Sequence, residues 1–227
     1  MTSLALLEIA RGAALWFSLL VLLVGAAWRV IALLWLGTRP DLSEPRSERR
    51  CAAIARAVFA RTLLRKEFRQ SRRFGPLSGY VYHLGLVVIV FGYLPHVAFV
   101  ARLTGIDWPA LPDAIVYLAV GPTIIALLLT LFERLTDPVL RLLSNFDDYF
   151  SWFVVFLPLL TGMTVLSGTP PRQGAASALY PLPLAVHLLS VELLLLWLPF
   201  GKLGHAFLVF LSRGTTAAAM ARKGASF

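Results

Sequence analysis

The sequence is poor in cysteine, histidine and acidic residues, and each shortage narrows what the protein can be. Cys51 is the single cysteine among 227 residues. The chain alone therefore cannot ligate an iron–sulfur cluster or attach a haem through a C-x-x-C-H motif. Only 12 Asp and Glu oppose 21 Lys and Arg, which leaves a net charge of +9. Four histidines complete the set of titratable groups that could hold a metal.

Apolar residues, in contrast, are abundant. They make up 58% of the chain, and the mean hydropathy is +0.76. That is beyond an ordinary soluble domain and indicates a polytopic membrane protein. The basic residues cluster in loops beside apolar runs, as membrane topology demands, so the positive charge does not indicate nucleic-acid binding. We expect membrane lipid to be the surrounding medium.

Long apolar runs predict an all-α bundle of five transmembrane helices in a single domain, residues 1–227. The expected spans are about 12–36, 77–103, 114–132, 149–167 and 182–212. The first apolar run is too long for a signal peptide, so we expect it to be retained as a helix. Gly121 and Pro122 are expected to break the third span.

The segment 37–75 sets the expected orientation. It carries eleven Lys or Arg against four acids, and by the positive-inside rule this loop is cytoplasmic. The N-terminus is then outside and the C-terminus cytoplasmic, which agrees with the acid-free tail after Arg213. Residues 52–68 could form a basic amphipathic helix on the membrane, with Ile54, Val58, Phe59 and Leu63 facing lipid. This loop is either a topology signal alone or a docking face for a cytoplasmic partner.

All four histidines lie in two of the expected spans. His187 and His205 are eighteen residues apart, which on one continuous helix is five turns and a rise of about 27 Å. Both would leave the same face, near opposite sides of a bilayer core about 30 Å thick. His83 and His96 lie in the second span. Because haem iron takes two axial imidazoles from facing helices, the pattern predicts two stacked bis-histidine haem sites.

Other roles for these histidines stay open. One membrane histidine can simply form an interhelical hydrogen bond. A zinc site is disfavoured because ligands so far apart cannot meet at one tetrahedral metal. A proton relay would have to use Glu192, the clear membrane carboxylate, and the alternative is that Glu192 is a protonated, hydrogen-bonding side chain.

The second and fifth spans run in opposite directions. We therefore expect His83 to pair with His205 near the cytoplasm, and His96 with His187 near the outer side. Thirteen residues place His96 about 140° from the face of His83, and Pro95 is expected to open a wide turn that reduces this angle. Gly85 and Gly92 leave one side bare, where either a flat macrocycle or another helix could approach.

Three segments carry a family resemblance: YHLGLVVIVFG, DPVLRLLSNFDDYFSWFVVFLPLLTG and HLLSVELLLLWLPFGKLGH. They resemble the membrane cytochrome b (gamma) subunit of respiratory nitrate reductase and its relatives in sulfur-metabolising and heterodisulfide-reductase-type complexes. The likeness covers about residues 10–213. By resemblance His83, His187 and His205 are haem ligands. The family has its other histidine directly after Gly92, where this chain has Tyr93, so His96 is assigned by chemistry alone.

The resemblance implies a subunit with two haem b groups in a prokaryotic cytoplasmic (inner) membrane. Such a subunit would pass electrons between membrane quinol or quinone and a cytoplasmic iron–sulfur subunit, with a terminal catalytic subunit beyond it. It would itself change no substrate other than the quinone. The alternative from another class is a cofactor-free membrane anchor or transporter.

Two further groups of residues are expected to bind ligands. Arg29 and Lys202 lie at about the depth of the cytoplasm-side haem and could pair with its propionates, although Arg29 could also snorkel to the interface. For the quinone we expect donors near the outer haem, at Tyr93, Arg102 and Asp107. The alternative is that Tyr93 belongs to the interfacial aromatic belt and Arg102 snorkels.

Overall fold

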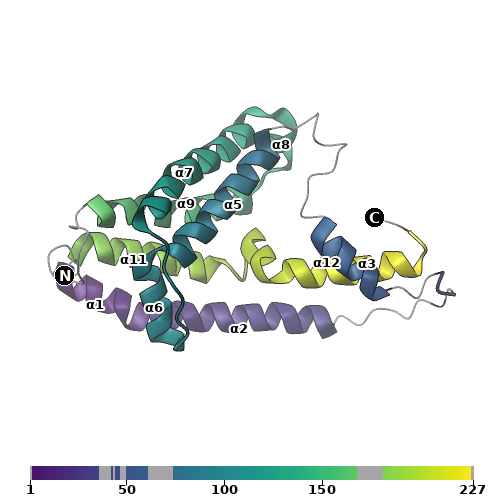
Figure 1. The fold of residues 1–227 in the computed structure, drawn as a ribbon, viewed down its shortest axis with the longest axis horizontal. Coiled ribbons are helices and arrows are strands. Elements are labelled where there is room, and N and C mark those ends of the chain that lie inside the picture. Colours follow the sequence, from purple (N-terminus) through teal and green to yellow (C-terminus); the bar gives the residue numbers. More distant parts are fainter. Residues whose placement is uncertain are drawn as a thin grey trace. The chain divides into compact units, whose positions relative to one another are not determined.

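The computed structural model describes residues 2–35, 42, 44–46, 50–60, 74–167 and 181–225. This part of the chain is helical and contains no strand. Figure 1 shows the elements, whose bounds are α1 (Ser3–Arg11), α2 (Ala13–Trp35), α3 (Arg50–Ala60), α5 (Phe74–Gly92), α6 (Leu94–Thr104), α7 (Asp113–Thr136), α8 (Pro138–Leu143), α9 (Phe146–Ser167), α11 (Pro181–Trp197), the 3₁₀ helix η1 (Lys202–Gly204) and α12 (His205–Arg222).

Four helical stretches in the described residues are long and apolar enough to cross a membrane: Ser3–Trp35, Gly75–Gly92, Asp113–Thr136 and Phe146–Val165. Pro181–Trp197 and Lys202–Arg222 pass the same test together, but as a pair bent by 80°. The number of spans is therefore four, or five if the bent pair crosses once. The expectation of an all-helical, multi-pass membrane protein is confirmed at this level.

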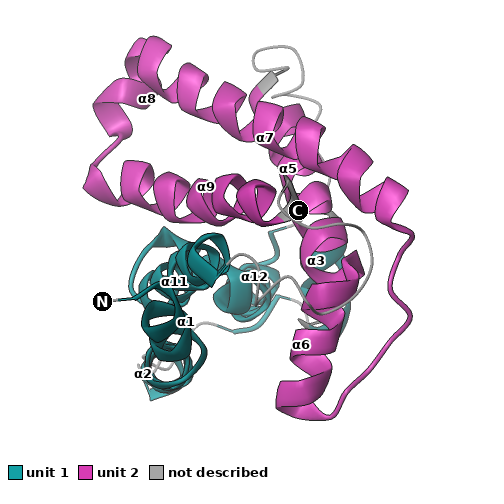
Figure 2. Cartoon of the chain, turned by 90° about the vertical axis from the view of Figure 1, so that its left-hand side faces the viewer, with its two compact units in different colours: residues 1–69, 169–227 teal, residues 70–168 magenta. Residues whose placement is uncertain are grey.

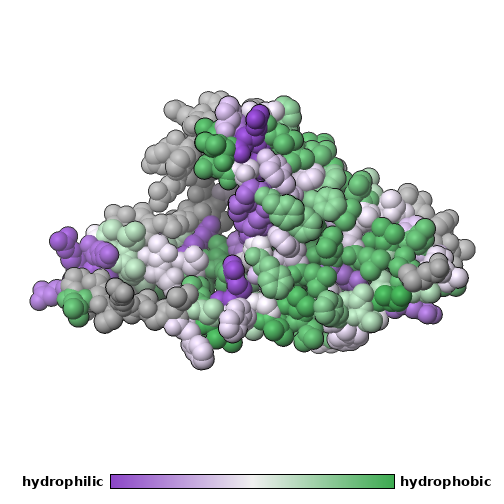
Figure 3. Space-filling view, turned by 180° about the vertical axis from the view of Figure 1, so that it is seen from behind, coloured by the Kyte–Doolittle hydropathy of each residue, from purple (hydrophilic) through white to green (hydrophobic). Residues whose placement is uncertain are grey.

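The surface agrees with a lipid environment. Large apolar side chains lie outside, among them Trp28 with 70% of its surface exposed, Leu118 with 77% and Leu23 with 66%. Figure 3 shows apolar residues covering much of the described surface in that view. Such continuous apolar exposure is not seen on soluble monomers, whereas a bilayer accommodates it.

The described chain divides into two compact units, coloured separately in Figure 2: residues 1–69 with 169–227, and residues 70–168. We call them unit 1 and unit 2 and describe each by itself. The first contains α1, α2, α3, α11, η1 and α12, and the second contains α5 to α9.

Unit 2 is built on the contact between α5 and α7. A methyl group added to Gly85 would collide with the Thr123 side chain, so the two helices approach closely there. Beside this contact a core cluster of Ile89, Val116, Leu127 and Leu159 is buried. Trp152 on α9 donates its indole N–H to the Leu127 carbonyl at 2.8 Å, which ties α9 to the same core.

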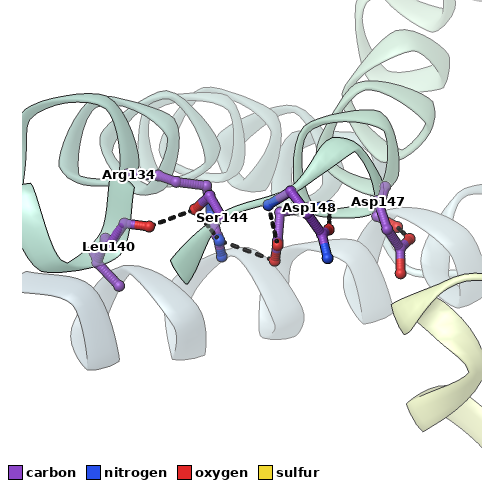
Figure 4. A network of polar contacts seen from close by, with 7 residues as sticks. Arg134, Leu140, Ser144, Asp147 and Asp148 are labelled. Carbon is purple, nitrogen blue, oxygen red and sulfur yellow. Dashed lines mark hydrogen bonds and ion pairs between the residues drawn. The ribbon is translucent and has the colours of Figure 1, made fainter. Parts of the chain in front are cut away.

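The α7–α8–α9 connection is held by a polar network (Figure 4). Arg134 Nη1 lies 2.9 Å from Asp148 Oδ1 and donates to Ser144 Oγ at 2.8 Å. Ser144 in turn donates to the Leu140 carbonyl at 2.6 Å. One arginine therefore fixes the end of α7 to the start of α9, with Asp148 almost completely buried.

Helix α7 runs through Pro122 without a break, so the expected interruption at Gly121 and Pro122 is wrong. Proline removes one backbone hydrogen bond, but membrane helices tolerate this loss where neighbouring helices hold them. Here Thr123 donates its hydroxyl to the Ala119 carbonyl at 2.6 Å, and α5 packs on this same stretch. The third span is also longer than expected, from Asp113 to Thr136.

The first helix of unit 1 begins at Ser3, nine residues before the expected first span. Thr2 caps α1 by accepting from the Ala5 N–H at 3.3 Å, and α1 and α2 together make one candidate span from Ser3. Leu36, the last residue of the predicted span, lies outside the described residues. Both α1 and α2 pack against α11. A methyl on Gly25 would lie only 2.7 Å from Pro199 Cβ, so α2 touches the chain directly after α11.

The part of the expected surface helix that the structure describes is helical, as α3, but part of its expected lipid-facing set contacts another helix. A methyl on Gly214 of α12 would lie 3.5 Å from Ile54 Cγ2, and Arg213 Nη1 donates to the Val58 carbonyl at 3.3 Å. Ile54 and Val58 therefore pack against α12, while Phe59 stays exposed. Leu63 and residues 61–73 of the basic loop lie outside the described residues.

Candidate functional site: two histidine-bearing segments

The four histidines are divided equally between the units. His83 on α5 and His96 on α6 belong to unit 2, and His187 on α11 and His205 on α12 belong to unit 1. Each expected haem pair takes one histidine from each unit. The pairing of His83 with His205 and of His96 with His187 therefore stays a prediction, and each unit's contribution is described in turn.

His83 is held in one tautomer by its own helix. Its Nδ1 lies 2.7 Å from the Gly79 carbonyl, and since a carbonyl oxygen can only accept, the proton is on Nδ1. In the neutral ring, Nε2 then carries the lone pair that a metal needs. The ring lies on an exposed apolar face of α5, beside Leu84 and Val87.

The two glycines of α5 lie on the side of the helix opposite His83. Gly85 and Gly92 are two and nine residues after His83, which is about 200° and 180° around the helix. Thr123 covers Gly85, and a methyl on Gly92 would lie 2.7 Å from Leu111 Cδ1. The two glycines therefore serve close packing, and the alternative that a macrocycle approaches over them is wrong.

The predicted second span, 77–103, is two helices. Helix α5 ends at Gly92, Tyr93 is extended with φ −75° and ψ 124°, and α6 begins at Leu94 with Pro95 in its first turn. Pro95 has no backbone N–H, so a helix continued through Tyr93 would leave the Phe91 carbonyl without its i+4 donor. The wide turn expected at Pro95 is thus a complete break.

The break turns His96 back towards α5. Its Nδ1 lies 2.9 Å from the Ile89 carbonyl, which again places the proton on Nδ1 and the lone pair on Nε2. The loop after α6 occupies other carbonyls at the broken end. Trp108 donates its indole N–H to the Phe91 carbonyl at 2.6 Å, and the Leu111 N–H bonds the Gly92 carbonyl at 2.8 Å.

Of the three residues expected to bind a quinone, the structure places only Tyr93 beside a histidine. Its ring meets the His96 ring edge-on, with centroids 5.2 Å apart, and lies 6.5 Å from the Tyr117 ring. Arg102 and Asp107 are exposed, and neither forms a hydrogen bond or ion pair with Tyr93. Asp107 accepts instead from the Trp108 N–H at 2.9 Å. Sequence reasoning missed Tyr117, although it lies four residues after Asp113, at the same end of α7.

The predicted fifth span, 182–212, is also two helices. Helix α11 ends at Trp197, the chain turns through Leu198–Gly201 and η1, and α12 starts at His205 with its axis bent by 80°. Pro199 has no N–H to continue α11, and Gly201 follows it. The expectation that His187 and His205 leave one face of a continuous helix, about 27 Å apart, is wrong.

The break does gather the residues expected around the second histidine. His205 Nδ1 lies 2.8 Å from the Lys202 carbonyl, so this ring too presents its lone pair on Nε2. Arg29 on α2 reaches the same place, because a methyl on Gly204 would be 3.8 Å from its Nη2. Arg29, Lys202 and His205 therefore lie together at the start of α12.

Helix α11 carries the other histidine and the buried acid. The His187 carbonyl accepts from the Ser190 hydroxyl at 2.6 Å. Glu192 is only 4% exposed, and its Oε1 has no hydrogen-bond partner. Within the described residues, no three side chains of His, Cys, Asp or Glu come together.

Comparisons with known proteins add little to this geometry. No family model matches the chain, and no solved structure matches it. A curated protein of Nitratidesulfovibrio vulgaris strain Hildenborough, described only as "Protein", is 28% identical over 141 residues. The aligned part is 62% of this chain and 59% of that protein, so the chain spans less than two thirds of its relative. That description names no activity.

Proposed function

We propose that the chain is a dihaem cytochrome b subunit of a membrane oxidoreductase, with His83, His96, His187 and His205 as the iron ligands. The observation that carries the proposal is the state of three of these rings. His83, His96 and His205 each hold Nδ1 against a backbone carbonyl at 2.7–2.9 Å. Metal-bound histidines are oriented by such bonds, which leave Nε2 to the metal.

The surroundings of these rings fit a haem. His83 stands on an exposed apolar face of α5, which suits contact with an apolar macrocycle. Arg29 and Lys202 at the start of α12 would pair with propionates, whose charge is costly when unpaired in an apolar medium. Bound haem b supplies reversible one-electron redox chemistry, and the chain's part is to orient the rings and exclude water.

The electron partners follow from what the chain carries. One cysteine cannot hold an iron–sulfur cluster, so we propose a cytoplasmic iron–sulfur subunit at the basic face, with a terminal catalytic subunit beyond it. Membrane quinol is the proposed electron source, at the outer end of α5. Tyr93 is the strongest donor there because it touches His96, whereas Arg102 and Asp107 are exposed and are proposed for this role on position alone.

A visible spectrum tests the proposal. Purified protein should show reduced b-type bands and two haems per chain, and His83→Ala or His205→Ala should each remove about one haem. Tyr80→Phe, on the same helix as His83, should keep both. A colourless protein at full purity would favour the alternative of a cofactor-free anchor or transporter.

The pairing has its own test. His83→Ala and His205→Ala should abolish the same spectral component, and His96→Ala and His187→Ala the other. Loss of one component by both His83→Ala and His187→Ala would show that the pairing is wrong, while leaving the haem assignment intact.

A further inference from the structure

Glu192 is a buried carboxyl group that the proposed electron path does not use. It lies on α11, five residues after His187, and its Oε1 accepts no hydrogen bond. An ionised carboxylate left unpaired in an apolar interior is strongly disfavoured. The Glu192 carboxyl group is therefore stable only when it is protonated or when a cation lies beside it, and it can alternate between these two states.

The register of α2 against α11 indicates which residue faces Glu192. Helices α2 and α11 run side by side in the same direction (Figure 1), and Gly25 touches Pro199. Ser18 is seven residues before Gly25, and Glu192 is seven before Pro199. Seven residues are about two turns, or about 10 Å. The Leu198 N–H still bonds the Leu194 carbonyl at 3.0 Å, so the helical backbone of α11 continues up to Pro199 and each residue lies below its contact residue on nearly the same face. Ser18 and Glu192 are therefore level across the α2–α11 interface.

Both members of this pair are buried, with Ser18 fully covered and Glu192 4% exposed. Ser18 donates its hydroxyl proton to the Leu15 carbonyl at 2.9 Å. Its oxygen is then left with lone pairs only, so it can accept from a carboxylic acid but cannot donate to a carboxylate. Ser18 thus favours the protonated form of a carboxyl group that faces it.

No described cation offers Glu192 an ion pair. The charged or titratable groups on the elements packed against α11 are Glu8 and Arg11 on α1 and Arg29 on α2, and all three are exposed. Arg29 is eleven residues beyond Ser18, about 16 Å along α2. On α11 itself the other titratable group is His187.

We propose that Glu192 and Ser18 form a proton-exchange site inside the membrane span. This rests on the proposed function in one respect: the site exchanges its proton with the redox state of the metal centre at His187 or His205. With a haem held there in the reduced state, Glu192 would be a neutral acid facing Ser18. Oxidation by one electron leaves one more positive charge nearby, which stabilises the carboxylate, and one proton leaves to water. Reduction takes the electron from quinol and the proton back from water.

Infrared difference spectroscopy on the purified full-length protein tests this, with electrochemical oxidation and reduction as the trigger. The wild type should lose a protonated-carboxyl C=O band on oxidation. Glu192→Gln should lack that band, because the amide keeps the shape but holds no exchangeable acid proton. Ser18→Ala should shift the band, since the hydroxyl that faces the acid is gone. Glu8→Gln, which changes an exposed acid on α1, should leave it unchanged.

The result that overturns the proposal is a redox-linked acid band that survives in Glu192→Gln, or no such band in a haem-loaded wild type. A merely structural Glu192 would change stability but not this spectrum. If the protein holds no haem, the proposed function fails separately. A pH titration of the colourless protein then still decides the proton site, because the acid band must disappear in Glu192→Gln and persist in Glu8→Gln.

Discussion

The two histidine-bearing segments, α5–α6 and α11–α12, are built on the same plan. Each begins with a long apolar helix that carries one histidine in its interior, His83 or His187. Each helix then stops near a proline, and the second histidine lies in the first turn of the next helix: His96 is the third residue of α6 and His205 the first of α12. In both, that second ring bonds a backbone carbonyl close to the break.

The breaks differ in length and in what holds them. Tyr93 alone separates α5 from α6, and the returning loop bonds the carbonyls of Phe91 and Gly92. Between α11 and α12 lie Leu198–Gly201 and a 3₁₀ turn, and Pro199 is fixed against Gly25 of another helix. A proline opens a helix, but the segments packed around it decide how far the chain turns.

The largest effect should come from the support of α5. In Gly85→Ala the new methyl would meet Oγ1, Cβ and Cγ2 of Thr123, so no rotation of that side chain relieves the clash. We expect a loss of about 3 kcal/mol in the free energy of unfolding, measured by denaturant titration in detergent. Gly79→Ala, which meets nothing within 4 Å, should instead stabilise the helix by about 0.5–1 kcal/mol. Equal effects at the two sites would contradict the close α5–α7 contact.

The corresponding change at the other break is Gly25→Ala, which presses a methyl on the Pro199 ring. The closest approach is 2.7 Å, to Pro199 Cβ, which is a milder overlap than the one at Thr123. We therefore expect a smaller loss, about 1–2 kcal/mol, in the same titration. If stability is unchanged, Pro199 is not fixed by α2.

Trp108→Phe sharpens the comparison at the first break alone. The change keeps an aromatic ring near Phe91 but removes the indole N–H that bonds the Phe91 carbonyl at 2.6 Å. One lost hydrogen bond should lower the free energy of unfolding by about 1 kcal/mol. Trp152→Phe, which removes the bond to Leu127 within the core, is the comparison variant and should cost at least as much. A neutral Trp108→Phe would show that water replaces the indole readily.

The smallest effect is electrostatic and rests on the proposed haems. Arg29 and Lys202 flank His205, whereas the ring beside His96 is Tyr93. Removing a cation disfavours the more negative, reduced centre, so Arg29→Met and Lys202→Met should each lower one midpoint potential by tens of mV, on the scale of about 59 mV per tenfold change. Redox titration should show the other centre unmoved. Unchanged potentials in both variants would remove these cations from the propionate role.

The sequence predicts the helices far better than their interruptions. Apolar runs mark each span, and α12 continues to Arg222 through the alanine-rich segment after Gly214, a helix signal that the predicted end at residue 212 left unused. Two prolines behave opposite to expectation. Pro122, where a break was expected, lies inside a continuous helix, while Pro199, inside an expected span, follows the end of α11. What distinguishes them is tertiary, since α5 packs over the first and Gly25 lies against the second.

The candidate site was predictable in composition but not in geometry. Four histidines on two segments, with Arg29 and Lys202 near His205, could be named from spacing and depth. The direction in which each histidine leaves its helix could not be predicted from spacing. The chain breaks between the two histidines of each segment, so counting residues along one continuous helix does not apply. Ser18 was missed altogether. Its only signal is the heptad spacing to Gly25, which gains meaning once the contact of Gly25 with Pro199 is known.

The first candidate span, Ser3–Trp35, is formed by α1 and α2 and is 33 residues long, which corresponds to about 50 Å of helix. A hydrocarbon layer about 30 Å thick cannot take that length upright, and tilting alone would need an angle well beyond the usual range. The surplus has to reach the headgroup region, and the exposed Glu8 and Arg11 make the α1 end suited to it. Hydrophobic mismatch therefore predicts that α1 leaves the hydrocarbon layer close to Gly12. Spin labels placed along Ser3–Arg11 should become accessible to aqueous quenchers within a few residues of Gly12.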